Sequence, residues 1–64
     1  MNEYRIRYTL EDMPKNYIGS CKKWAHNEKE AVRYLLKKNA DKDGHCVFKR
    51  GSSGRILSVQ EIKH

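Results

Sequence analysis

Hydrophobic and polar residues alternate along the first part of the chain. Between Tyr4 and Leu10 every second residue is apolar, which is the period of a β-strand with one buried side. The residues on the apolar side are Tyr4, Ile6, Tyr8 and Leu10, and those on the other side are Arg5, Arg7 and Thr9. The pattern therefore predicts a half-buried strand over Tyr4–Leu10 whose second side is polar and basic.

The period changes between His26 and Asn39, where the apolar residues are spaced as on one face of a helix. These residues are Ala31, Val32, Leu35 and Leu36. Asn27 is a suitable N-cap, and Glu30, three residues later, completes a capping-box pattern. We predict one helix over His26–Asn39, followed by a polar exit turn that ends at Gly44.

Three further segments have the composition of strands, namely Tyr17–Ala25, His45–Arg50 and Arg55–Ile62. A short loop of turn-forming residues precedes the first of them, and the GSSG sequence at 51–54 predicts a hairpin turn between the last two. The alternation in Tyr17–Ala25 is imperfect. A β-bulge at Gly19 would reconcile the two halves of this strand.

The order of elements is β-β-α-β-β, which predicts a single small α+β domain over residues 1–64. We expect a four-stranded antiparallel sheet with one helix packed on one face. A single helix leaves the second face of such a sheet open to water. If Ile6 packs under the helix, Arg5 and Arg7 lie on that open face. Lys49 joins them if Phe48 points inward.

Composition adds a strong positive charge to this fold. The chain has 14 Lys and Arg residues against 8 Asp and Glu, a net charge of +6, which favours anionic partners. We therefore predict a small basic accessory protein, not an enzyme, that binds nucleic acid (DNA or RNA) through the sheet face and the second hairpin. The residues assigned to this role are Arg5, Arg7, Lys49, Arg50 and Arg55.

Two alternatives to nucleic-acid binding stay open. The chain fits equally a protein-interaction module, or a small inhibitor, that binds an acidic surface on a larger protein. The basic excess also fits a solvated surface that only confers solubility. A chain of 64 residues buries little of its surface, so a homodimer would be one way to bury more.

A second basic group lies on the predicted helix, where Lys29, Arg33 and Lys37 form a stripe at i, i+4 and i+8. A single stripe of this kind is typical of the solvent side of an amphipathic helix.

The aromatic residues are expected mainly in the core, because the alternation sends Tyr4 and Tyr8 towards the helix. Stacking on single-stranded bases would need aromatic rings on the open face instead.

The histidines and cysteines do not have the spacing of a metal site. They are Cys21, His26, His45, Cys46 and His64, without a Cys-x-x-Cys or His-x-x-x-His pair. We expect no metal and no cofactor.

No segment resembles a signal peptide or a membrane span, so we expect a cytoplasmic protein that does not interact with membranes. In the cytoplasm we expect both thiols to be reduced.

One segment, 44–59, resembles the small mRNA-interferase toxins that share a double-stranded-RNA-binding-type fold. The similar residues are Gly44, His45, Phe48, Lys49, Gly54 and Arg55. The resemblance covers about a quarter of the chain, and the serine that precedes the histidine in that family is absent. It implies a third hypothesis, a ribonuclease that depends on His45.

Overall fold

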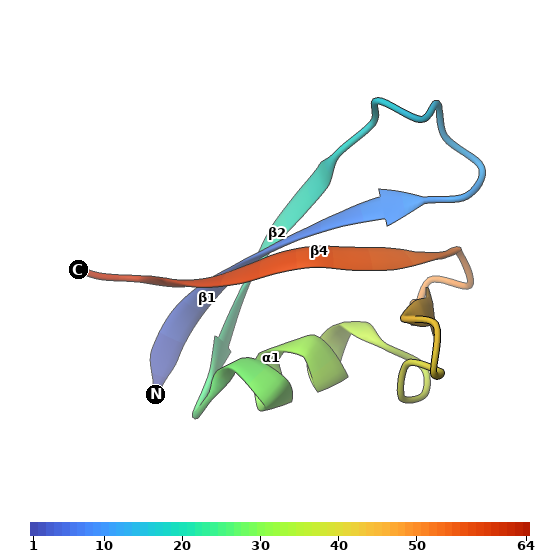
Figure 1. Cartoon of the computed structure of the whole chain (residues 1–64). Helices are drawn as coiled ribbons and strands as arrows, with labels where there is room; N and C mark the ends of the chain where they lie inside the picture. Colours follow the sequence, from blue (N-terminus) through green and yellow to red (C-terminus); the bar gives the residue numbers. More distant parts are fainter.

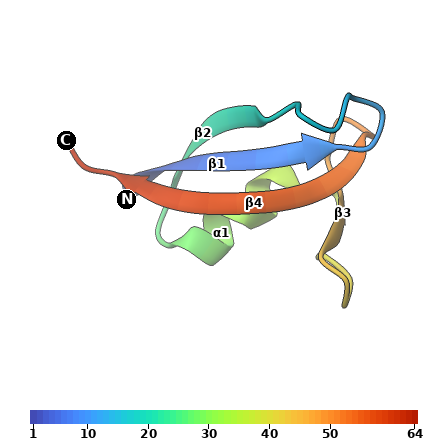
Figure 2. The same cartoon turned by 45° about the horizontal axis from the view of Figure 1, so that its top comes forward.

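The structure, a computed structural model that describes residues 1–64, has four strands and one helix. Their bounds are β1 (Asn2–Leu10), β2 (Gly19–Ala25), α1 (Glu28–Leu35), β3 (His45–Val47) and β4 (Ser53–Ile62). The strands form one antiparallel sheet in the order β2-β1-β4-β3 (Figure 1). Helix α1 lies against one face of this sheet (Figure 2). The predicted α+β fold with the order β-β-α-β-β is confirmed.

Helix α1 begins as the sequence indicates. The side chain of Asn27 accepts a hydrogen bond from the backbone N–H of Glu30 at 2.8 Å, and Glu30 Oε1 accepts one from the backbone N–H of His26 at 3.1 Å. These reciprocal bonds are the expected capping box. They satisfy backbone donors that have no partner inside a helix.

The helix ends four residues earlier than predicted, at Leu35 instead of Asn39. Leu36 is extended, with φ −94° and ψ 142°, and forms an isolated β-bridge with Phe48. The backbone N–H of Lys37 donates to the carbonyl of Val47 at 2.8 Å, which continues the pairing. Leu36 therefore becomes buried against the segment after β3, and this tertiary contact outweighs the helical pattern of the sequence.

The second hairpin also differs from the prediction in its bounds. Strand β3 ends at Val47, and β4 already begins at Ser53, so the turn occupies residues 48–52 instead of 51–54. Within it, the backbone N–H of Gly51 donates to the carbonyl of Phe48 at 2.8 Å. Gly51 has φ +99°, a left-handed conformation that glycine adopts without strain.

The predicted bulge at Gly19 is wrong. Gly19 pairs in register with Tyr8, and the ring of Tyr8 occupies the space that a Cβ at position 19 would need. The register shift lies in β4 instead, where Leu57 is skipped between the pairs Tyr8–Ile56 and Arg7–Ser58. Leu57 is the extra residue of a β-bulge and is exposed.

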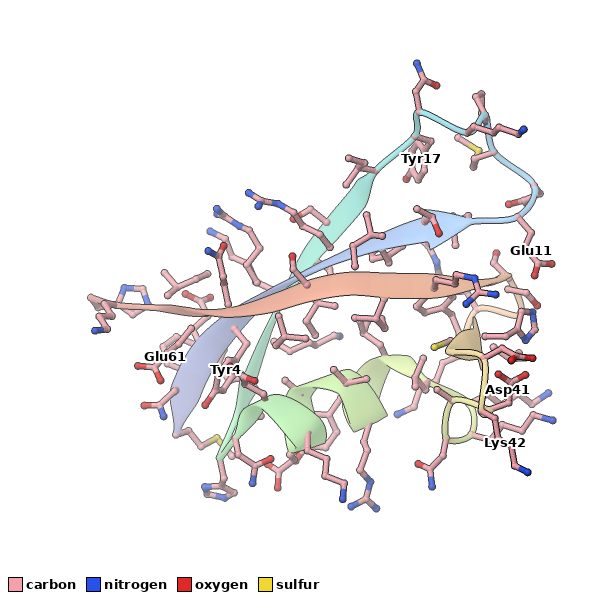
Figure 3. The ribbon with its side chains drawn as sticks, in the orientation of Figure 1. Tyr4, Glu11, Tyr17, Asp41, Lys42 and Glu61 are labelled. Carbon is pink, nitrogen blue, oxygen red and sulfur yellow. The ribbon has the colours of Figure 1, made fainter.

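The core lies on the helix side of the sheet. It consists of two small clusters, one of Tyr4, Ile6, Ala25 and Ala31 and one of Leu36, Cys46 and Phe48. Leu35 and Ile56 pack against both clusters and join them. Figure 3 shows Tyr4 on the helix side of the sheet, as the alternation in β1 predicts.

The two cysteines are free and lie on the two edge strands, Cys21 on β2 and Cys46 on β3. Cys21 is level with Ile6 of β1, whereas Cys46 is level, through Gly54 of β4, with Leu10 of β1. The two cysteines are therefore offset by four residues, about 13 Å, along the strands. A disulfide needs Cα atoms within about 7 Å. The fold therefore keeps these thiols apart. No helix has the length and apolar character needed to cross a membrane.

Candidate nucleic-acid interface

The sheet surface that faces away from α1 is ordered by the strand register, because residues paired across neighbouring strands point to the same side. Arg5 of β1 lies between Lys22 of β2 and Gln60 of β4. Arg7 lies between Ser20 and Ser58 in the same way. We call this surface the open face. In β1, β2 and β4 its residues are Glu3, Arg5, Arg7, Thr9, Ser20, Lys22, Trp24, Arg55, Ser58, Gln60 and Ile62. In β3, His45 lies opposite Arg55 at one end of this face.

The centre of the open face is positively charged and not neutralised. Arg5 and Lys22 are direct cross-strand partners, which brings the Cβ atoms of two cations to about 5 Å from each other. The only ion pairs of the structure involve histidines, so no Lys or Arg side chain lies within 4.0 Å of a carboxylate. Like charges directly opposite each other destabilise a sheet. An anion bound over Arg5 and Lys22 would relieve this repulsion.

Next to this basic row is an exposed aromatic group. Trp24 is 53% exposed and is the direct cross-strand partner of Glu3. The ring of His64 stacks on the indole, with ring centroids 5.7 Å apart and an angle of 11° between the planes. His64 Nε2 also lies 2.9 Å from Glu3 Oε1. Because a carboxylate can only accept, Nε2 carries the proton of this hydrogen bond.

The structure divides the five residues assigned to nucleic acid from the sequence between two sides of the molecule. Arg5, Arg7 and Arg55 lie on the open face. The guanidinium of Arg55 donates to the backbone carbonyl of Asp43, at the end of the sheet near β3. Lys49 and Arg50 lie on the helix side, where they line a cavity, and so do not join the arginines of β1.

Lys49 is on the helix side although Phe48 points inward, because the chain leaves the sheet at that point. The backbone N–H of Lys49 donates to the carbonyl of Leu35 at 2.9 Å, which ties it to the end of α1. The expectation that Lys49 joins the open face is therefore wrong. Alternation along a strand no longer applies after Val47, where β3 ends.

The cavity on the helix side has a volume of about 280 Å³ and an apolar floor with three cations. The cations are Lys23, Lys49 and Arg50, and the floor includes Tyr8, Leu35 and Phe48. Cys21 also lines it. Burial raises the pKa of the Cys21 thiol above its ordinary value of 9.0, and the positive charges of Lys23 and Arg50 offset part of this effect. The thiol is therefore protonated at neutral pH and a weak nucleophile.

His45 is held between two acidic residues at one end of the molecule. Its Nε2 lies 2.8 Å from Glu11 Oε1, and its Nδ1 lies 3.8 Å from Asp41 Oδ2. Figure 3 shows Glu11 and Asp41 at this end, near β3. Asp41 also accepts hydrogen bonds from the backbone N–H groups of His45 and Asp43, and these lower the pKa of its carboxyl. These contacts tie three segments of the chain together.

No group of three or more histidine, cysteine, aspartate and glutamate side chains has the arrangement of a metal site.

In the segment that resembles the interferase toxins, β4 runs to Ile62 and no helix follows it up to residue 64. Lys29 and Arg33 of the predicted basic stripe are exposed on α1, whereas Lys37 is exposed but lies beyond the end of the helix at Leu35. The three residues therefore do not form one helical stripe, because the helix ends before Lys37.

Two residues of the open face, Lys22 and Trp24, are absent from the set assigned from the sequence. The alternation of Ser20, Lys22 and Trp24 already places these three on one side of their strand. What the sequence does not show is that this side continues the arginine-bearing side of β1. That follows only from the register, in which Arg5 is opposite Lys22 and Glu3 is opposite Trp24.

Comparison of the chain with protein-family models, with curated proteins and with solved structures finds no match.

Proposed function

We propose that this protein binds nucleic acid through the open face and performs no chemical step on it. The observation that carries the proposal is the direct opposition of Arg5 and Lys22, two cations without a carboxylate partner. Such a pair reduces the stability of the free protein, and phosphate groups would compensate it. Arg7, on the same strand and face as Arg5, extends the positive surface to a third cation.

Serine and glutamine side chains next to these cations suit the same ligand. Ser20 and Ser58 flank Arg7, and Gln60 flanks Arg5. Hydroxyl and amide groups donate hydrogen bonds to phosphate and sugar oxygens in protein–nucleic acid complexes. With two free thiols in the chain, we propose the reducing environment of the cytoplasm as the compartment of this binding.

The proposal predicts a definite dependence on salt. If three cations each neutralise one phosphate, the logarithm of the association constant falls with the logarithm of the salt concentration with a slope of about −2 for a single strand. The measurement is fluorescence anisotropy of labelled single-stranded DNA, RNA and duplex DNA at several salt concentrations. Dissociation constants of about 100 μM or lower are expected at low salt.

A matched pair of variants separates the open face from general basicity. The variant Arg5→Gln/Arg7→Gln/Lys22→Gln removes three charges from the open face. The variant Lys29→Gln/Arg33→Gln/Lys37→Gln removes three from exposed positions of α1 and of the segment directly after it. The first should abolish binding, and the second should retain most of it. Equal losses in both variants, or no binding by the wild type at low salt, would rule the proposal out.

A second candidate function rests on the cavity of the helix side. Its apolar floor and its three cations, Lys23, Lys49 and Arg50, suit an acidic segment of a protein partner with one apolar side chain. We propose this protein-interaction role as the alternative. It would be supported by a partner that survives nuclease treatment in a pull-down and is lost with Lys49→Ala/Arg50→Ala, while the open-face variant retains it.

A further inference from the structure

We infer that the nucleic acid bound by the open face is single-stranded, and that one base stacks on Trp24 in place of the ring of His64 while Glu3 accepts a hydrogen bond from its exocyclic amino group. This inference rests on the proposed function. It adds a site for a base beside the cations that would hold the backbone.

The contacts of His64 define the shape and chemistry of such a site. Its ring lies parallel to the indole of Trp24, at an angle of 11°, and its Nε2–H donates to Glu3 at 2.9 Å. Trp24 and Glu3 are cross-strand partners on the open face, so they present these two groups side by side. A flat nitrogen heterocycle with one N–H directed at a carboxylate is what this pair of residues accommodates.

Nucleobases with an amino group meet the same requirements. Cytosine presents an N4 amino group and adenine an N6 amino group, both donors, and a glutamate accepts from such a group. Thymine has a carbonyl oxygen, O4, at the corresponding position. The one donor that thymine can offer to the carboxylate of Glu3 is N3–H, which lies between two carbonyl oxygens that repel a carboxylate. The site therefore favours cytosine and adenine over thymine and uracil.

A base can displace the side chain of His64 without disturbing the sheet. It follows β4, which ends at Ile62, so its backbone takes no part in the ladder of the sheet. Its side chain is 62% exposed, and the stack on Trp24 and the hydrogen bond to Glu3 are the contacts that hold it. A base that makes both contacts would replace it without rearrangement of the sheet.

The dimensions of the sheet favour a single strand over a duplex. The major groove of B-DNA is wide enough for a two-stranded β-ribbon, whereas the open face extends over more than two strands. The open face therefore does not enter that groove flat. In a single strand the bases are free to stack on an aromatic side chain. Lys22 and Arg5 lie two residues along their strands from Trp24 and Glu3, about 7 Å away, within reach of a neighbouring phosphate.

The sole tryptophan of the chain is the reporter for the test. Titration of the wild-type protein with oligo(dC) and oligo(dT) of equal length, followed by intrinsic fluorescence, should show strong quenching by oligo(dC) and a dissociation constant lower by about tenfold than that for oligo(dT). The ribonucleotides oligo(C) and oligo(U) show whether RNA follows the same order. Duplex DNA of the same length should bind more weakly than oligo(dC).

Three variants test the three contacts by anisotropy of labelled oligonucleotides. Trp24→Leu should weaken oligo(dC) binding by about tenfold or more, and Trp24→Phe should retain most of it. Glu3→Gln should remove the preference for oligo(dC) over oligo(dT), because an amide can also donate to O4 of thymine. His64→Ala should tighten oligo(dC) binding severalfold, since the competing ring is absent.

The possible failures are distinguishable. If single strands and duplexes bind equally, if oligo(dT) binds as tightly as oligo(dC), or if Trp24→Leu leaves a salt-dependent affinity unchanged, the base site is wrong and binding by the open face stands. The same holds if His64→Ala binds oligo(dC) no more tightly than the wild type. If the wild type binds none of these nucleic acids at low salt, the proposed function itself fails.

Discussion

The two faces of the sheet differ in what their side chains do: those on one face form the core, and those on the other are mostly charged or polar and face water. The helix face contains the whole core, including Ile6 and Ala31, which are completely buried. The open face contains Arg5 and Arg7 on either side of Ile6 in the same strand. Within β1 the two faces therefore come from the same stretch of sequence and differ only in the direction of alternate side chains.

This difference is the reason for assigning the proposed function to the open face. On the helix face, each buried side chain contributes to folding through burial of apolar area. On the open face, the pairing of Arg5 with Lys22 reduces stability, and Trp24 is 53% exposed to water. In a small domain, residues that do not contribute to the stability of the fold are candidates for contact with a partner. The variants below measure stability and binding separately for the two faces.

The largest effect is expected from the neighbouring residues Ile6 and Arg7, which point to opposite faces. Ile6→Ala removes a fully buried side chain and should lower the free energy of unfolding by about 2–5 kcal/mol. A chain of 64 residues has a total stability of about 3–10 kcal/mol, so this variant should lose a large part of its stability. Urea denaturation followed by circular dichroism gives the value.

Arg7→Ala is the matched control for Ile6→Ala. It should change the free energy of unfolding by no more than about 0.5 kcal/mol, because its side chain is exposed and contacts no acidic group. It should nevertheless weaken nucleic-acid binding. If Arg7→Ala were as destabilising as Ile6→Ala, the assignment of the two faces to stability and binding would be lost.

The division into two faces could be predicted from the sequence because alternation is a local property. Tyr4 and Ile6 are buried, as their positions in the pattern of β1 indicate. The capping box at Asn27 and Glu30 is equally local, and the start of the helix was predicted correctly to within two residues. The end of the helix depends on the bridge from Leu36 to Phe48, a contact between distant residues, and no local pattern shows it.

The candidate site could be predicted only in part, for the same reason. Arg5 and Arg7 follow from alternation within one strand. Lys22 joins them through the register between β1 and β2, which the sequence does not show. Lys49 and Arg50 lie on the other side of the molecule because the chain turns away from the sheet after Val47. The identity of neighbouring strands and the points where strands end determine which charges meet.

A smaller effect, of opposite sign for the two measured properties, is expected at Lys22. Lys22→Gln removes one of two opposed cations and should raise the free energy of unfolding by about 0.2–1 kcal/mol at low salt. The same variant should weaken nucleic-acid binding and reduce the salt slope by about 0.7 for a single strand. Thermal denaturation at low and high salt, together with anisotropy, measures both.

Lys23→Gln is the control for Lys22→Gln, since Lys23 is adjacent in the same strand but points to the helix face, opposite Tyr4. It has no cationic cross-strand partner there, although it lines the cavity of the helix side with Lys49 and Arg50, so any gain in stability should be smaller than that of Lys22→Gln. The gain from Lys22→Gln should decrease at high salt, where the repulsion is screened. A loss of stability in Lys22→Gln would contradict the repulsion between Lys22 and Arg5.

The smallest expected effect is the loss of stability at low pH. It distinguishes the two faces of the sheet, because the Lys and Arg side chains of the open face have no carboxylate partner that protonation would remove. Away from that face, the carboxyl of Glu30 has a pKa below its ordinary value of 4.5, chiefly because it accepts from the backbone N–H of His26 and also from the hydroxyl of Tyr34. A lowered folded-state pKa contributes stability above the unfolded value, and this contribution is lost as the pH falls through the folded value. Asp41 behaves in the same way below its ordinary value of 3.8.

Glu30→Gln and Asp41→Asn should therefore lower the midpoint of thermal unfolding most at pH 7, and the difference from the wild type should shrink as the pH falls to 3. Glu28→Gln is the control, because Glu28 lies in the same helical turn as Glu30 and makes no side-chain hydrogen bond. Its effect should depend less on pH. If the differences for Glu30→Gln and Asp41→Asn stayed constant from pH 7 to 3, these carboxylates would not be the source of acid sensitivity. Lys22→Gln should retain its gain in stability over the same range, since neither Lys22 nor Arg5 has a carboxylate partner to lose there.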